Sequence, residues 1–126
     1  MIVGIGSDLV KIARIEQGMA RFGDRFLEKL FTPAEILHCQ TKARPAACFA
    51  KRFAAKEALA KAMGCGFRQG IWFLDMEVKN DEQGAPEMVV TGGAHAYLSR
   101  WPGRVIHLSL SDEEEFALAF VVIDSP

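Results

Sequence analysis

The stretch that decides the fold reads FAKRFAAKEALAKAM at residues 49–63, and it ends in Gly64-Cys65-Gly66. Its many alanines, lysines and leucine favour a long helix, because these residues have high helix propensity. An apolar stripe follows from the helical rotation of about 100° per residue, and its members are Phe49, Phe53, Ala60 and Met63. The stripe predicts one face buried against a core.

Charged residues border this stripe. Lys56 falls inside it, and a lysine there must either extend its ammonium to solvent or find a buried partner. Glu57 and Lys61 lie one turn apart, a spacing that on its own predicts only a weak helical ion pair. Arg52 lies on the opposite flank, where a basic residue is most simply a solvated one. The alternative is that these bases bind a multiply charged anion.

Length and composition predict a single globular domain over residues 1–126. A chain of this length removes roughly two-thirds of its unfolded surface from water on folding, so it has a real core. Half of the residues are hydrophobic and a quarter are charged, which excludes a disordered chain. The net charge of −1 predicts no general affinity for nucleic acid.

The cysteines and the apolar runs indicate the compartment. Cys39, Cys48 and Cys65 lack the spacing of a zinc site, and we expect reduced thiols. No signal peptide is recognisable at residues 1–8, and no apolar run approaches the ~20 residues that span a bilayer. We therefore expect no membrane association and a cytoplasmic location.

Most of the predicted helices lie in the first half of the chain. A short buried strand is expected over residues 2–6, where two glycines would let a backbone or a ligand approach closely. Apolar spacing predicts a helix over residues 9–22, and a second short helix should follow Asp24 as N-cap. The sequence Thr32-Pro33-Ala34-Glu35 is a capping box, which predicts a third helix over residues 33–40.

Strands dominate the second half. A glycine-rich loop over residues 64–70 should end the long helix, which Pro45 is expected to open. Further elements follow from alternation and turn residues: a hairpin of residues 76–79 and 87–91, a helix over 94–101, and a strand pair of 105–111 and 116–124. This order predicts an α+β domain whose largely antiparallel sheet packs against the long central helix and shorter helices.

Two carboxylates are candidate metal ligands. Asp8 follows the first strand and its glycines, although its position alone favours a helix N-cap. Glu57 lies within the basic helix. Two carboxylates with several bases fit Mg²⁺-assisted phosphoryl transfer, in which Mg²⁺ takes one or two carboxylates and substrate phosphate while the bases neutralise the remaining charge.

Three segments together resemble a known family. They are Gly4-Ile5-Gly6-Ser7-Asp8-Leu9-Val10, the run KRFAAKEALAKA at residues 51–62, and Ser109-Leu110-Ser111-Asp112. In order and spacing they resemble the holo-[acyl-carrier-protein] synthases, the short single-domain 4′-phosphopantetheinyl transferases. The resemblance covers the whole chain.

The resemblance implies Mg²⁺-dependent transfer of 4′-phosphopantetheine from coenzyme A to a serine of apo acyl carrier protein, with release of adenosine 3′,5′-bisphosphate. It also implies a homotrimer with active sites at subunit interfaces. The alternative is a non-catalytic module that binds coenzyme A or a nucleotide through the basic helix alone.

The resemblance assigns roles to residues of the long helix and the first strand. Asp8 and Glu57 match the family's metal ligands, and with Lys61 they would form the catalytic set. Lys61 matches a lysine that contacts a coenzyme A phosphate, and Arg52 matches a base close to the 3′-phosphate. Lys56 matches the lysine beside the metal-binding glutamate and is placed with the coenzyme A-binding residues.

Other assignments concern the nucleotide and the carrier protein. The loop Gly64-Cys65-Gly66 and Pro86 match segments that approach the nucleotide. Arg14 and Arg21 fall on the helix whose basic face docks the acidic carrier protein in this family.

One position departs from the family pattern. Many members end the penultimate strand in Ser-His, whereas here Ser111 is followed by Asp112. An aspartate cannot donate a hydrogen bond to phosphate as histidine does, so the histidine's role is not carried over. The general base for the acceptor serine stays unassigned, with a metal-bound water and a carboxylate as alternatives.

Overall fold

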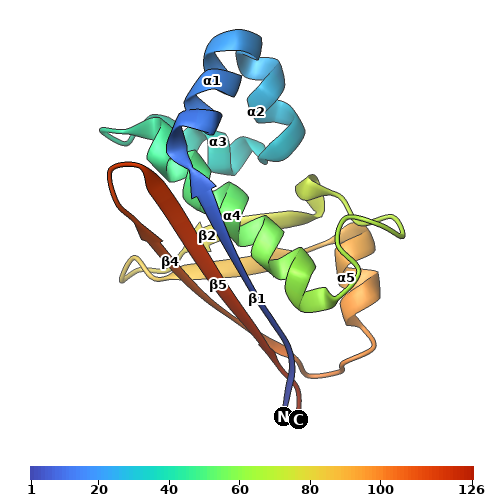
Figure 1. The fold of residues 1–126 in the computed structure, drawn as a ribbon. Helices are drawn as coiled ribbons and strands as arrows, with labels where there is room; N and C mark the ends of the chain where they lie inside the picture. Colours follow the sequence, from blue (N-terminus) through green and yellow to red (C-terminus); the bar gives the residue numbers. More distant parts are fainter.

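The structure is a computed structural model that describes all residues, 1–126. Figure 1 shows an α+β fold, as expected, in which one long helix crosses a twisted antiparallel sheet. The elements are β1 (Ile2–Lys11), α1 (Ile12–Phe22), α2 (Asp24–Leu30), α3 (Pro33–Gln40), α4 (Pro45–Met63), a 3₁₀ turn η1 (Phe73–Asp75), β2 (Met76–Asn80), β3 (Pro86–Val90), α5 (Gly92–Leu98), β4 (Val105–Asp112) and β5 (Phe116–Asp124).

The main sheet has the strand order β1-β5-β4, and both pairings are antiparallel. Its central strand is therefore β5, which pairs with β1 from the other end of the sequence. A separate hairpin is formed by β2 and β3. Helices α1–α3 cluster at one end of the sheet, and α4 runs across its inner face (Figure 1). No helix is long and apolar enough to cross a membrane.

Helix α4 occupies the centre of the molecule. Its limits are those that the sequence predicts, since it opens at Pro45 and ends at Gly64, which adopts the left-handed conformation with φ 86°. The expected stripe is buried, and burial extends beyond it over nearly the whole circumference of α4. The reason is its small side chains, which let β1, β5 and the other helices approach from several sides. The buried alanines are Ala46, Ala47, Ala50, Ala54, Ala55, Ala58, Ala60 and Ala62.

Strand β1 packs directly on α4 through its glycines. A Cβ atom on Gly4 would collide with the carbonyl oxygen of Ala62, and one on Gly6 would collide with that of Ala58. The expected close approach is therefore confirmed, and the group that approaches is the helix backbone.

The first strand is longer and the first helix shorter than predicted. Residues through Lys11 belong to β1, because β5 offers a continuous partner that pairs Leu9 with Leu118 and Lys11 with Phe116. Leu9 therefore lies on the outer face of the sheet. The N-cap interpretation of Asp8 is wrong, because Asp8 lies inside the strand, three residues before the N-cap of α1.

Smaller differences concern two short helices and the cysteines. Asp24 is the first residue of α2 and not its N-cap, and α5 starts two residues earlier than expected. Cys39 and Cys48 form a disulfide across the α3–α4 turn, with their Cα atoms 5.4 Å apart, so the expectation of reduced thiols is wrong for both. Cys65 is free.

Replacing Gly6 by alanine is expected to destabilise the fold by about 3 kcal/mol, because the new methyl group must displace the α4 backbone. Urea unfolding followed by circular dichroism measures this. Ser7→Ala, at the exposed neighbouring position, is the control and should change stability by less than about 0.5 kcal/mol. A Gly6→Ala variant as stable as this control would show that α4 does not pack rigidly on β1.

Candidate active site

Asp8 lies in the middle of β1 with its side chain on the inner face of the sheet, and that side chain is 16% exposed. The Lys61 ammonium donates to Asp8 Oδ1 at 3.1 Å and to the carbonyl oxygen of Ser7 at 2.9 Å. The interpretation of Lys61 as a helical partner of Glu57 is therefore wrong. Lys61 instead reaches across from α4 to β1.

Glu57 lies one turn before Lys61 on α4. Its carboxylate forms no hydrogen bond or ion pair with Lys61 or with any other side chain. Burial and the negative charge of Asp8 raise the pKa of Glu57, while the positive charges of Lys61 and Arg14 oppose this rise. The two carboxylates are thus close enough to repel each other. The structure brings together Asp8, Glu57 and Lys61, as the sequence predicts.

The donor set of this acid pair fits Mg²⁺. The chain has no cluster of three or more histidine, cysteine or acidic residues that would hold a metal ion alone. Mg²⁺ binds through one or two carboxylates and completes its shell with water and phosphate oxygens, whereas zinc and calcium sites use more protein ligands. Asp8 and Glu57 supply two hard oxygen donors that repel each other, so a divalent cation between them would relieve that repulsion.

A cavity of about 340 Å³ opens beside Lys61. It is lined by the C-terminal end of α4 and by the loop that follows, including Gly64, Cys65 and Gly66. Arg68 also lines it, and the sequence interpretation missed this base because Arg68 stands alone in the glycine-rich loop.

A larger cavity of about 490 Å³ surrounds Arg52 near the other end of α4, and Pro86 lines it as well. The sequence analysis missed most of its bases, because they lie on α3, on the turn after it and on α4, and no motif marks them as one site. The basic residues of this cavity are His38, Lys42, Arg44, Lys51 and Arg52. We call it the basic cavity.

Arg52 is buried at its wall, with 3% of its surface exposed, so the expectation of a solvated residue is wrong. Its guanidinium donates to Asn80 Oδ1 at 2.7 Å and to Cys48 Sγ at 3.5 Å, while Nε is buried without a partner. Burial lowers the pKa of His38, and the positive charges of Arg52, Lys42 and Lys51 lower it further. The basic cavity is therefore strongly electropositive and suited to an anion.

Asp112 also lines the basic cavity, and its carboxylate forms an ion pair of 3.1 Å with Lys51. The Asp112 carboxylate thus partly neutralises a neighbouring lysine of the cavity.

Arg52 and Lys61 do not meet in one cavity. They are roughly 13 Å apart along the axis of α4, at 1.5 Å per residue. The residues that the resemblance assigns to one nucleotide therefore lie in separate places on one chain.

Lys56 is not at either cavity, because it is fully buried. Its ammonium forms an ion pair with Glu35 at 2.6 Å and donates to the Leu30 carbonyl oxygen at 2.7 Å. Burial lowers the pKa of Lys56, and the Glu35 carboxylate opposes this. Of the two alternatives that the sequence left open for Lys56, the structure shows the buried partner. The side chain has no surface with which to contact coenzyme A, contrary to the role that the resemblance implies.

The bases of α1 lie on its exposed side. Arg14 acts electrostatically on Glu57, so it lies at the edge of the acid pair. The Arg21 guanidinium lies 5.1 Å from the ring centre of Phe22, which is itself largely exposed. The helix thus presents basic and apolar groups on a surface that borders the carboxylates.

A carboxylate pair beside electropositive cavities is typical of enzymes that transfer phosphate-linked groups. Residues 4–121 match the family model described as "ACPS: 4'-phosphopantetheinyl transferase superfamily". The chain therefore belongs to the 4′-phosphopantetheinyl transferase superfamily, and within it to the holo-[acyl-carrier-protein] synthase family.

Full-length relatives support this family membership. The holo-[acyl-carrier-protein] synthase of Methylobacterium sp. (strain 4-46) is 50% identical over 129 residues, which cover 99% of this chain and 96% of that protein. The synthase of Koribacter versatilis (strain Ellin345) is 48% identical over 124 residues, which cover 98% of this chain and 99% of the relative.

Solved structures of the family have the same fold. The synthase from Neisseria meningitidis superposes with a TM-score of 0.90 at 40% identity, over 99% of this chain and 100% of the other. The Bacillus anthracis synthase, described as a complex with CoA (3',5'-ADP), gives 0.83 at 38% identity over 100% and 99% of the two chains. The Helicobacter pylori synthase in complex with coenzyme A gives 0.84 at 33% identity over 95% and 99%.

Without Mg²⁺, Glu57→Gln is expected to raise the melting temperature more at about pH 7 than at about pH 4. The pKa of Glu57 is raised in the folded state, so the folded protein loses stability as the pH rises from the ordinary glutamate pKa through that raised value. Glutamine carries no charge and escapes this loss. Scanning calorimetry at both pH values measures the difference, and equal shifts would contradict the repulsion between the carboxylates.

Proposed function

We propose that this chain transfers 4′-phosphopantetheine from coenzyme A to a serine of apo acyl carrier protein, with Mg²⁺ as cofactor. The observation that carries this proposal is the convergence of Asp8, Glu57 and Lys61 beside the cavity that ends α4. The names of the full-length relatives and the coenzyme A bound in the Helicobacter pylori structure support the substrates.

In the proposed reaction, the serine hydroxyl gives its proton to a general base, and its oxygen forms a bond to the phosphorus that bears pantetheine. The bond from that phosphorus to the bridging oxygen breaks, and adenosine 3′,5′-bisphosphate leaves. Asp8 and Glu57 would hold Mg²⁺, which when bound would supply neutralisation of the phosphate charge. The Lys61 ammonium stabilises the negative charge that develops on the leaving group.

We assign the nucleotide to the two electropositive places on α4. The loop Gly64-Cys65-Gly66 with Lys61 would contact the pyrophosphate end. The basic cavity, with Arg52 and Pro86, would take the 3′-phosphate end. Support comes from the basic side chains that line this cavity, because together they make it electropositive and suited to a phosphate group.

We also propose that the acidic carrier protein docks on α1. Arg14 borders the acid pair, and Arg21 lies further along the same exposed surface next to Phe22. Basic groups around an exposed aromatic ring suit an acidic partner, because the charges steer it while the ring provides apolar contact. We propose in addition that the protein is located in the cytoplasm.

Glu57→Gln is expected to abolish Mg²⁺-dependent transfer, with a loss of at least about 100-fold, because the variant lacks one of two metal-binding carboxylates. The assay incubates the protein with coenzyme A, Mg²⁺ and apo carrier protein, and detects the added phosphopantetheine by mass spectrometry. Circular dichroism controls for folding.

Two outcomes would contradict the proposal. A fully active Glu57→Gln variant with normal metal dependence would overturn the assignment of the metal ligands. A wild-type chain that binds coenzyme A but modifies no carrier protein would favour the alternative, a non-catalytic module for coenzyme A or a nucleotide.

We further propose a homotrimer formed through the outer face of the main sheet. Helix α4 covers the inner face, whereas the outer face carries exposed apolar side chains on neighbouring strands. Such a patch is unusual for a monomer. Its members are Ile5, Leu9, Val105, Leu118 and Phe120. Subunit contact would also explain why Arg52 and Lys61 lie apart, because one nucleotide could then bridge two chains.

Phe120→Asp is expected to reduce the assembly to monomers and to lower transfer activity by at least about tenfold, because a buried charge at an interface is strongly unfavourable. Light scattering coupled to size-exclusion chromatography measures the mass. Leu37→Asp is the matched control, since Leu37 is an exposed leucine on α3, away from the sheet. A wild-type chain that is monomeric at micromolar concentration would contradict this proposal.

A further inference from the structure

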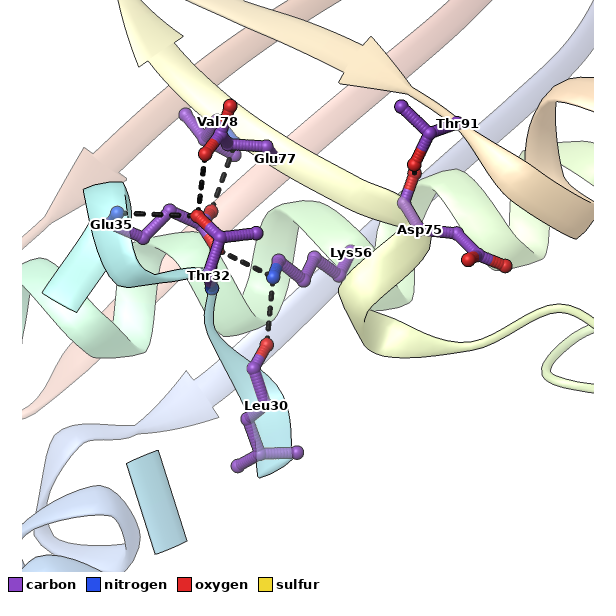
Figure 2. A network of polar contacts seen from close by, with 8 residues as sticks. All are labelled: Leu30, Thr32, Glu35, Lys56, Asp75, Glu77, Val78 and Thr91. Atoms are coloured by element: carbon purple, nitrogen blue, oxygen red, sulfur yellow. Dashed lines mark hydrogen bonds and ion pairs between the residues drawn. The ribbon is translucent and has the colours of Figure 1, made fainter. Parts of the chain in front are cut away.

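The buried ion pair of Lys56 and Glu35 is the centre of a polar network (Figure 2), and neither residue lines the basic cavity or the cavity beside Lys61. The Lys56 side chain is 0% exposed and the Glu35 side chain is 0% exposed. The ammonium donates to Glu35 Oε1 at 2.6 Å and to the carbonyl oxygen of Leu30, the last residue of α2, at 2.7 Å. A buried pair of this kind is costly to desolvate, so stability alone does not explain it.

The Glu35 carboxylate accepts hydrogen bonds from two further groups, and one of its partners, Thr32, extends the network to Glu77. Glu35 Oε1 also accepts from the backbone N–H of Thr32 at 2.9 Å, and its Oε2 accepts from the backbone N–H of Val78 at 2.9 Å. The Thr32 hydroxyl donates to Glu77 at 2.6 Å. Figure 2 shows that one carboxylate thereby joins the start of α3, the strand β2 and the middle of α4. No polar side-chain atom of the pair is left without a partner.

The packing of α4 indicates what this network does in the structure. Most buried positions on α4 are alanines, and alanine methyl groups define the rotation of a helix about its axis only weakly, since they offer no directional contact. A hydrogen-bonded ion pair is directional, and its best attested use in buried places is to fix the register of neighbouring elements. Lys56 provides such a contact at mid-helix.

Lys56 directly precedes Glu57, and successive helical residues point about 100° apart. With Lys56 held against α3 and β2, Glu57 is directed toward Asp8 of β1. A small rotation of α4 would move the Glu57 carboxylate away from Asp8 and separate the two metal-binding groups.

We propose that Glu35 is a positioning residue for the metal site: by holding Lys56 it sets the rotation of α4 that directs Glu57 toward Asp8. This inference rests on the proposed function, because it concerns the metal that Asp8 and Glu57 would hold. It assigns a functional role to the capping-box glutamate of α3, which never contacts substrate or metal.

The test measures metal binding directly, with Mn²⁺ as the probe and electron paramagnetic resonance of the free ion as the readout. In the full-length chain, Glu35→Gln keeps the shape of the side chain and removes its charge. We expect Mn²⁺ affinity to fall by about tenfold or more, as is usual when a group that orients a metal ligand is lost. The Mg²⁺ concentration for half-maximal transfer should rise by a similar factor.

A matched control separates positioning from simple loss of stability. Leu98→Ala removes a fully buried side chain of α5, far from the network in sequence and on another element. It should destabilise the fold by about 2–5 kcal/mol while leaving Mn²⁺ affinity unchanged. A second variant, Glu35→Leu with Lys56→Met, replaces the pair by apolar side chains and preserves folding, and it should also bind Mn²⁺ about tenfold more weakly.

Wild-type Mn²⁺ affinity in the folded Glu35→Gln chain or in the double variant would overturn the positioning role, and it would leave the proposed function intact. Equal loss of affinity in Leu98→Ala would also overturn it, because general destabilisation would then be sufficient. A wild-type chain that neither binds Mn²⁺ nor modifies the carrier protein would overturn the proposed function, and the positioning role with it.

Discussion

The direct packing of the α4 backbone on β1 is the constraint on which the rest of the structure depends. Gly4 and Gly6 leave no side chain between the strand and the helix carbonyl oxygens. This proximity lets Lys61 bridge to Asp8 and brings Glu57 within electrostatic range of the same carboxylate. With a larger residue at either glycine, the two carboxylates would separate, and the electrostatic character of the site would be lost.

Local signals in the sequence were sufficient for most of the fold. The capping box at Thr32 and the proline at residue 45 defined two helix starts correctly, and alternation identified the β2–β3 hairpin. The boundary at Leu9 was wrong because its spacing suits a helix as well as a strand. Only the partner strand β5 decides between them, and that partner is distant in sequence.

The site could be predicted where its residues belong to recognisable sequence motifs. Asp8, Glu57 and Lys61 meet as the sequence analysis and the resemblance suggest. The basic cavity was missed, because its bases are contributed by three segments and none is distinctive alone. The position of Lys56 in an apolar stripe left two alternatives, an ammonium extended to solvent or a buried partner, and no local pattern indicated that Glu35 of the capping box would be that partner.

The pairing of β1 with β5 has a consequence for the order of folding. Asp8 belongs to the first strand, and the ladder that holds this strand is completed only by the last one, opposite Ala119. Such non-local pairing forms slowly, because the long intervening chain must close into a loop before any contact between the two strands can stabilise it. During synthesis β1 and the helices α1–α4 emerge before β5, so β1 has an unpaired apolar edge until the last strand is made. The carboxylate pair is therefore among the last features to form, after the helices have folded around α4.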